Sequence, residues 1–174
     1  MKKLLLILPL LLTSLFADVD TTKPLTPLVL KGDNGGSFDG SSWSSDVLKG
    51  KTTMLMYVDP DEKNKGEVFK PTIEAFEKDL DFSKFQILVI INLNATWKPD
   101  AIIKKMMKSK VDTYPKRTYI LDAQSVLVKG WNLPDDEYNT LIIDQNAKVI
   151  FQHTGDWDEV QMQEVNTLVR SEVK

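Results

Sequence analysis

The sequence contains no cysteine and only one histidine, His153, among its 174 residues. Without cysteine the chain cannot form a disulfide, present a thiol nucleophile or supply a thiolate to a metal. Thiol–disulfide oxidoreductase and thiol peroxidase activities are therefore excluded. A single histidine also leaves most His-based metal sites and catalytic triads without their parts. These absences predict no catalytic residue set, no metal and no cofactor, and they favour a protein that is not an enzyme.

Long apolar runs are scarce as well, because the one clear run lies at the start of the chain, in MKKLLLILPLLLTSLFA. Lys2 and Lys3 precede the apolar stretch Leu4–Leu12, and small residues follow at Ser14 and Ala17. This order is typical of a secretory signal peptide, and the stretch is short for a membrane span. We expect cleavage near Ala17, export to a bacterial periplasm and no transmembrane segment in the mature chain.

Removal of residues 1–17 would leave 157 residues, which is enough for one domain with a substantial core. The polar, proline-containing stretch at 18–27 predicts a flexible entry segment. Residues 28–174 are then expected to form a single domain.

The sequence also has no excess of positive charge: it contains 22 Lys and Arg and 25 Asp and Glu, which gives a formal net charge of −3. An acidic chain of this kind is a poor partner for nucleic acid. The exception is local: five lysines fall between Lys98 and Lys110. That run is typical of a solvated helix face, and weak contact with anionic lipid headgroups is the functional alternative.

The remaining pattern alternates short apolar runs with amphipathic segments, which indicates an α/β fold with a mixed sheet. The expected strands are Leu28–Leu30, Thr52–Val58, Gln86–Leu93, Thr118–Leu121, Val126–Val128 and Thr140–Ile143, with a hairpin partner after the last. Helices are expected over Glu67–Leu80, with Pro71 at a kink or first turn, and after Pro99 with Ile102, Ile103, Met106 and Met107 facing inward. A final helix is expected to begin at Asp156, with Glu159 completing a capping box. His153 is expected on the hairpin strand, partly buried and hydrogen-bonded.

One turn in this pattern resembles the site of thioredoxin-like proteins. Gly50 and Lys51 precede the strand Thr52–Val58, as in the periplasmic reductases of that fold. The resemblance implies a Cys-x-x-Cys position at KNKG, Lys63–Gly66, reached both by counting along the strand and by counting back from Pro71. It also implies that Tyr138 or Asn139 replaces the cis-proline that contacts substrate peptides in the redox enzymes. The implied fold is a thioredoxin-like three-layer sandwich, a central mixed β-sheet flanked by helices.

Within that fold the chain is similar to the YtfJ family of exported bacterial proteins. The resemblance rests on LKGK (48–51), DEKNK (61–65), IINLN with Trp97 beyond it, GWNL (130–133) and IIDQNAKVIFQHTG (142–155). Their order along the whole mature chain carries the resemblance, which implies a thioredoxin-like protein without the redox pair.

In such a fold the turn after the first central strand lies beside the loop that precedes Tyr138. Two groups of acids, 59–62 and 135–137, would then meet, with Trp131 placed to line the same groove. The candidate binding groove comprises Asp59, Asp61, Glu62, Lys63, Gly66, Trp131, Asp135, Asp136, Glu137 and Tyr138. The leading hypothesis is that this groove binds a periplasmic protein or peptide. Metal-dependent activity around Asp61 and Asp135, and a purely structural or scaffolding role, are the alternatives.

Overall fold

The computed structural model of the protein describes residues 19–174. The expected signal peptide and its cleavage site lie outside the described residues. Within residues 19–174, no helix combines the length and the apolar character needed to cross a membrane.

A six-stranded mixed sheet forms the middle layer, in the order β2-β6-β5-β4-β7-β8. Its members are β2 (Gly35–Ser37), β4 (Thr52–Val58), β5 (Phe85–Asn92), β6 (Arg117–Asp122), β7 (Tyr138–Ile143) and β8 (Val149–Thr154). Strands β4, β5 and β6 run parallel, whereas β2, β7 and β8 pair antiparallel with their neighbours. Every residue of β4 is buried, as expected of a continuous apolar run at the centre of a sheet.

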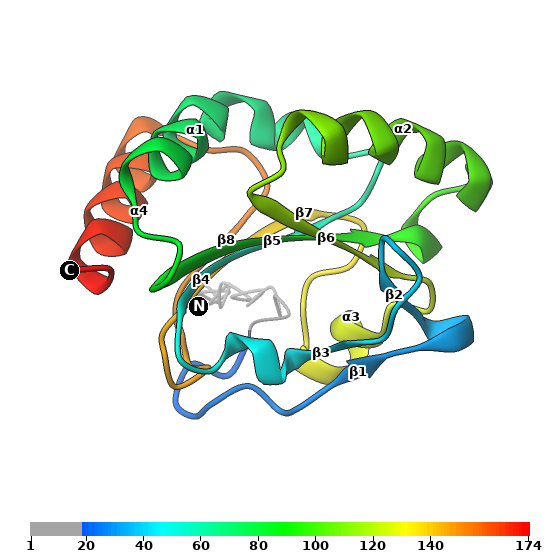
Figure 1. Ribbon diagram of the computed structural model, residues 1–174, viewed down its shortest axis with the longest axis horizontal. Coiled ribbons are helices and arrows are strands. Elements are labelled where there is room, and N and C mark those ends of the chain that lie inside the picture. Colours follow the sequence, from blue (N-terminus) through cyan, green and yellow to red (C-terminus); the bar gives the residue numbers. More distant parts are fainter. Residues whose placement is uncertain (1–18) are drawn as a thin grey trace, which may run out of the picture.

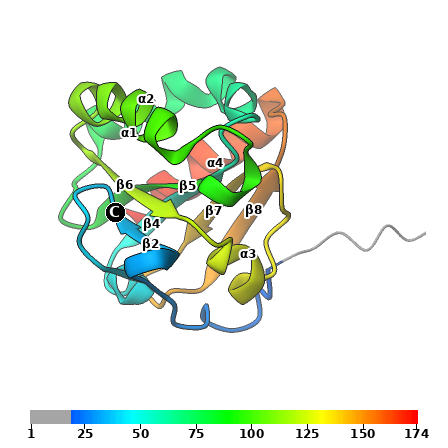
Figure 2. The same cartoon turned by 90° about the vertical axis from the view of Figure 1, so that its right-hand side faces the viewer.

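Three helices cover one face of this sheet (Figures 1 and 2). They are α1 (Lys70–Asp79), α2 (Asp100–Thr113) and α4 (Glu159–Glu172). A 3₁₀ helix, η3 (Lys63–Phe69), leads from the turn after β4 into α1, whose first turn contains Pro71. Proline fits there because its missing N–H has no partner in a first helical turn.

The opposite face carries the shorter elements (Figure 1). These are β1 (Val29–Leu30), η1 (Gly32–Asn34), β3 (Trp43–Ser44), η2 (Ser45–Leu48) and α3 (Val126–Trp131), while η4 (Leu93–Ala95) follows β5. Alternate residues of β4 point to the two sides of the sheet. Met54 and Met56 join the core under α1 and α4, whereas Leu55 and Tyr57 join the core on the α3 side. The predicted α/β three-layer arrangement, a central mixed β-sheet flanked by helices, is confirmed.

Residues 19–25 lie along the edge strand β8 and the turn that precedes it. The Val19 amide donates to Gln152 Oε1 at 3.0 Å, and the Leu25 amide donates to the Ala147 carbonyl at 2.8 Å. Pro24 forms an isolated bridge with Lys148. The sequence over 19–27 is mostly polar, with two prolines and the isolated apolar residues Val19 and Leu25, so these long-range contacts have no local signal.

Three local predictions were wrong. Val126–Val128 belongs to helix α3 instead of a strand, because β-branched residues alone do not distinguish a strand from one buried helical turn. The last helix is capped by Asp158, with Gln161 completing the capping box, instead of by Asp156 and Glu159. Helix α2 buries only Ile103, while Ile102 and Met106 are exposed.

Candidate functional site

The turn after β4 occupies the position where a thioredoxin-like protein carries its cysteines. Here Lys63 begins η3 and Gly66 is buried within it. A Cβ built on Gly66 would lie 2.3 Å from Cζ and 2.5 Å from Oη of Tyr138. The Tyr138 ring, 8% exposed, therefore fills the space that a side chain at position 66 would need.

Tyr138 begins β7 and pairs with Val58 at the end of β4. Its hydroxyl donates to Met56 Sδ at 3.1 Å, and burial raises the pKa of this phenol above its usual value of 10.0. No described residue follows a cis peptide bond. The resemblance to the redox enzymes thus puts Gly66 at the position of a thiol and Tyr138 or Asn139 at that of the cis-proline, and here Tyr138 is neutral and packed against Gly66.

The two acidic loops do lie side by side, as the sequence analysis expected. The Asp59 amide donates to the Glu137 carbonyl at 3.1 Å. Lys65 Nζ joins the loops through ion pairs to Glu62 at 2.9 Å and to Glu137 at 2.7 Å. These two contacts raise the pKa of Lys65 above its usual value.

Most of the acidic side chains in these loops already have partners. Asp61 forms an ion pair with Lys98 and accepts a hydrogen bond from Thr96 Oγ1 at 2.8 Å. Asp135 accepts a hydrogen bond from Asn92 Nδ2 at 3.0 Å. In residues 19–174 no group of three or more Asp, Glu or His side chains is arranged to hold a metal ion.

Asp59 differs from its neighbours because it is buried. Burial, reinforced by the nearby carboxylates of Asp136 and Glu62, raises its pKa from 3.8 to about 6. Its Oδ1 accepts a hydrogen bond from the Asp61 amide at 2.8 Å. This carboxylate therefore shapes the turn and has a pKa well above that of an exposed aspartate.

Trp131 does not belong to this region. It is buried on the opposite face of the sheet, where its indole N–H donates to the Thr26 carbonyl at 2.8 Å. Its ring packs edge-on against Trp43, with centroids 6.5 Å apart. The placement of Trp131 in the groove was wrong, because it lies at the buried end of α3.

Next to Gly66 and Tyr138 the structure has an apolar slot between α1 and α2, with a volume of about 150 Å³. Its floor is formed by Met56 and Val58 of β4 and by Val89 and Ile91 of β5. The remaining lining residues, which come from η3, both helices and the strands beyond, are Lys63, Gly66, Glu67, Lys70, Ile73, Met107, Lys110, Tyr114, Arg117, Tyr119 and Tyr138. We call this cavity the α1–α2 slot.

Sequence reasoning found only Lys63, Gly66 and Tyr138 of this slot. Met107 and Tyr119 have the pattern of ordinary core residues, and Lys110 closes a lysine run typical of a solvated face. Only the crossing of α2 over β5 and β6 brings these residues to the turn after β4. The one signal available in the sequence was Lys110, a basic residue that follows Ile103 and Met107 on the same side of α2.

The aromatic end of the slot is held by a largely buried ion pair. Arg117 Nε lies 2.7 Å from Glu77 Oε1, and a second guanidinium nitrogen donates to the other carboxylate oxygen at 3.1 Å. The Arg117 guanidinium also stacks on the Tyr114 ring at 3.9 Å. A two-point pair of this kind fixes the orientation of both side chains.

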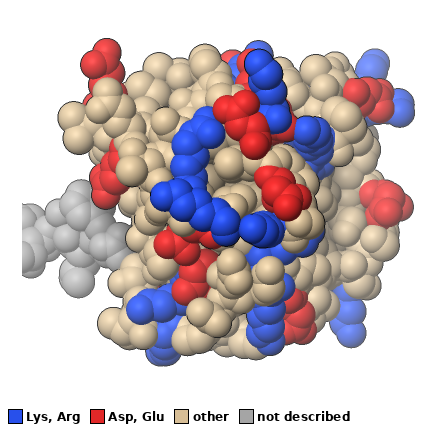
Figure 3. All heavy atoms as spheres, turned by 60° about the vertical axis from the view of Figure 1, so that its left-hand side comes forward, with Lys and Arg blue, Asp and Glu red and all other residues tan. Residues whose placement is uncertain are grey.

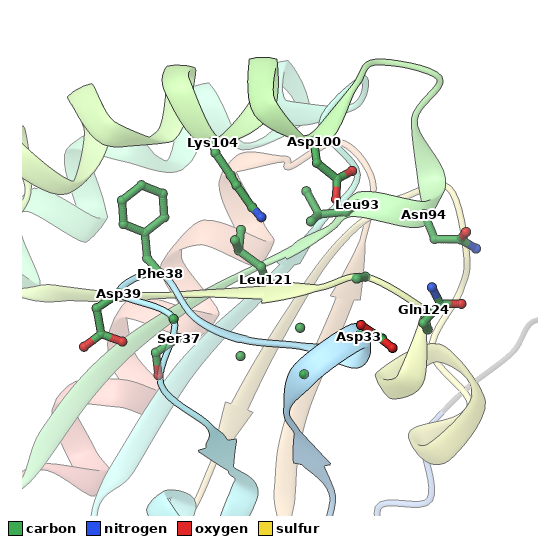
Figure 4. Close-up of a pocket in the computed structure, with 15 residues that line it drawn as sticks. Asp33, Ser37, Phe38, Asp39, Leu93, Asn94, Asp100, Lys104, Leu121 and Gln124 are labelled. Carbon is green, nitrogen blue, oxygen red and sulfur yellow. The ribbon is translucent and has the colours of Figure 1, made fainter.

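A larger, polar groove of about 670 Å³ lies between α2 and the glycine-rich segment around β2 (Figure 4). Asp100 and Lys104 point into it from α2, opposite Asp33. Gly35 and Gly36 also line it, and at both positions close approach to a neighbouring carbonyl group leaves no room for a side chain. Polar side chains of both signs and several apolar ones share the rest of its lining, and none of the lining residues belongs to the turn after β4.

Charge is mixed over the surface. In Figure 3 basic and acidic side chains alternate over the face turned to the viewer, with a few basic groups curving around a shallow hollow. No large field of one sign is seen on that face, in keeping with a formal net charge of −3. Local arrangement of charge, more than net charge, must then decide what the slot attracts.

Comparison with known proteins identifies a family and a fold. The model of the family described as "Bacterial protein of unknown function (YtfJ_HI0045)" matches residues 27–172. The chain is 25% identical over 158 residues to the uncharacterized protein YtfJ of Escherichia coli strain K12, a match that covers 84% of this chain and 79% of that one.

Solved structures of low sequence identity share the fold. A putative protein disulfide isomerase from Bacteroides thetaiotaomicron superposes with a TM-score of 0.65 at 17% identity, covering 89% of this chain and 91% of its own. A putative thiol:disulfide interchange protein DsbE from Chlorobium tepidum gives 0.62 at 14% identity, with coverage of 90% and 100%. An exposed lipoprotein thioredoxin of Streptococcus pneumoniae gives 0.61 at 15% identity, with coverage of 82% and 99%.

Proposed function

The chain belongs to the YtfJ_HI0045 family of bacterial proteins of unknown function, and we propose that it is an exported binding protein without enzymatic activity. It would act in the periplasm and hold a protein or peptide partner at the α1–α2 slot. The chemistry of the thioredoxin-like site is gone, while a cavity remains at the same place.

The observation that carries this proposal is the pairing of Gly66 with Tyr138. Together they close the position of the missing thiol and form one end of an apolar cavity. Concave, apolar cavities with a few polar groups at the rim are the usual form of a binding site. The loss of reactive groups beside such a cavity favours binding over catalysis.

The acidic loops support the same view. Lys65 holds the two loops together through Glu62 and Glu137, and Lys98 ties Asp61 to the segment before α2. A general acid or base would need a substrate pocket within hydrogen-bond reach. The slot is lined by neither Asp59 nor Asp135.

Site-specific photo-crosslinking tests the proposal. A benzophenone amino acid replaces Val68 of η3, which is 54% exposed and follows the slot-lining Glu67 in the chain, or Val47 of η2, which is 46% exposed and lies on the other face of the sheet. In periplasmic extract of the source organism, the Val68 position should give a reproducible adduct that the Val47 position does not. Equal adducts at both positions would indicate a scaffold with no preferred site, and none at either would contradict the proposal.

Export is tested separately by cell fractionation and by mass spectrometry of the mature N-terminus. The proposal expects the protein in the periplasmic fraction, with a new N-terminus close to residue 18. A full-length protein retained in the cytoplasm would contradict it.

Contact with a membrane surface is a second candidate, favoured by the outer side of α2. Trp97 is 85% exposed immediately before this helix, and Lys98 lies over its ring at 5.6 Å. Aromatic and basic side chains together are typical of surfaces that meet anionic headgroups. Co-sedimentation with phosphatidylglycerol vesicles, lost in Trp97→Ser and absent with phosphatidylcholine alone, is the expected result.

A further inference from the structure

The size of the α1–α2 slot limits what can enter it. Its volume is about 150 Å³, and a dry apolar cavity of about that size in another protein accepts a benzene-sized molecule. The floor of Met56, Val58, Val89 and Ile91 has no side chain that could bond a polar group strongly. One phenylalanine, leucine or methionine side chain matches this space.

The charges at the mouth of the slot favour an anion next to that apolar group. Lys63, Lys70 and Lys110 all line the slot, against the one unpaired carboxylate of Glu67. Among residues 19–174 no carboxylate lies within ion-pair distance of Lys63 or Lys110, and Lys70 reaches Glu74 only at 3.9 Å. Arg117 is already neutralised by Glu77.

The surface beside the slot indicates an occupant longer than a small molecule. Ile102 and Met106 are about half exposed on α2. They lie two turns and one turn before Lys110, so the three side chains form one stripe along the helix. An exposed apolar stripe that leads to a basic cavity gives a chain segment a surface on which to lie.

We propose that the α1–α2 slot binds the carboxy-terminal residue of a partner polypeptide. Its apolar side chain enters the slot, its terminal carboxylate meets Lys63, Lys70 and Lys110, and the preceding residues lie on Ile102 and Met106. This inference rests on the proposed binding function and specifies the part of the partner that is recognised.

Peptide titration followed by ¹⁵N NMR tests the inference on the mature protein. Three N-acetylated peptides are compared: Gly-Gly-Phe with a free carboxylate, the same peptide as its amide, and Gly-Gly-Ala with a free carboxylate. The first should shift the amide signals of Gly66, Lys110 and Tyr138 in a saturable manner. The amide and the alanine peptide should each bind at least about tenfold more weakly, since one loses the charge and the other the buried group. High salt should weaken the first peptide selectively.

Variants then locate the contact. Met107→Trp, which fills the slot from a half-buried position, should abolish the shifts. Lys110→Gln should raise the dissociation constant about threefold to fivefold, as expected of an exposed ion pair. Lys108→Gln, on the solvent side of the same helix, is the matched control and should have no effect. Unchanged thermal unfolding of each variant shows that the fold is intact.

The inference is overturned if the amide binds as tightly as the acid, if Met107→Trp binds normally, or if free 3-phenylpropanoate binds and the peptide does not. The last result would identify a small-molecule site. A Val68 adduct that persists in Met107→Trp would reject both this inference and the slot as the binding site of the proposed function. A Val68 adduct that is lost in Met107→Trp, together with equal binding of the acid and amide peptides, would reject the carboxy-terminal inference and leave the proposed function standing. Peptide binding without any adduct in extract would support the slot and contradict the proposed function.

Discussion

The contact between Gly66 and Tyr138 makes a quantitative prediction. A methyl group at position 66 would lie within 2.5 Å of three atoms of the Tyr138 ring and hydroxyl, Cζ, Cε2 and Oη. Overpacking of this kind costs about 1 to 3 kcal/mol. Replacing glycine by alanine inside a helical segment returns roughly 0.5–1 kcal/mol, because the unfolded chain loses freedom. Gly66→Ala should therefore lower the free energy of unfolding by about 1 kcal/mol, and by no more than about 2.5 kcal/mol.

A double-mutant cycle shows whether Tyr138 is the cause. Tyr138→Leu removes all three contacted atoms, so Gly66→Ala in that background should be neutral or slightly stabilising. The coupling free energy between the two positions should be at least about 1 kcal/mol, within the range seen for residues in contact. Urea unfolding followed by tryptophan fluorescence measures all four proteins. Additive effects of the two substitutions would refute the reasoning.

Three further predictions concern the surroundings of the slot. The folded-state pKa of Asp59, about 6, lies above the usual 3.8, so ionisation of this carboxylate lowers the free energy of unfolding. This loss of stability is absent below about pH 4 and complete above about pH 6. Asp59→Asn should thus raise the free energy of unfolding at pH 7.5 by up to roughly 3 kcal/mol and leave it unchanged at pH 4; a constant difference across this pH range would contradict the assignment. Glu77→Gln should cost about 3 kcal/mol, because Arg117 and Glu77 are only 10% and 14% exposed. Asp112 forms an ion pair with Lys108, and their side chains are 67% and 74% exposed. Asp112→Asn should therefore lower the free energy of unfolding by less than about 0.5 kcal/mol in the same urea assay. An equal loss of stability in Glu77→Gln and Asp112→Asn would contradict this prediction. The protein should not catalyse reduction of insulin disulfides, and measurable turnover would reject the exclusion of thiol chemistry.

The sheet could be predicted from the sequence because its signals are local and strong. Thr52–Val58 is an apolar run long enough for a central strand, and the spacing to Pro71 located the turn that follows it. Helix α3 could not be predicted in the same way. Val126 and Val128 have strand propensity, but Asp122 accepts hydrogen bonds from the Val126 and Leu127 amides and so supports a helical start.

The candidate site shows the same limit. The meeting of the two acidic loops followed from the resemblance to a known fold, and the Asp59–Glu137 contact agrees with it. The slot did not follow, because its lining comes from segments far apart in the chain. Met107 and Tyr119 carry no sign of facing a cavity, and Gly66 is informative only when the position of Tyr138 is known.

The most direct test of binding at the former thiol position is the Val68 photo-crosslink in periplasmic extract, measured with the slot open and with the slot filled. The account predicts a discrete adduct in the otherwise natural protein and its loss in Met107→Trp, with Lys108→Gln unaffected. An adduct of equal yield in the slot-filled protein would contradict the claim that the α1–α2 slot is where the partner binds.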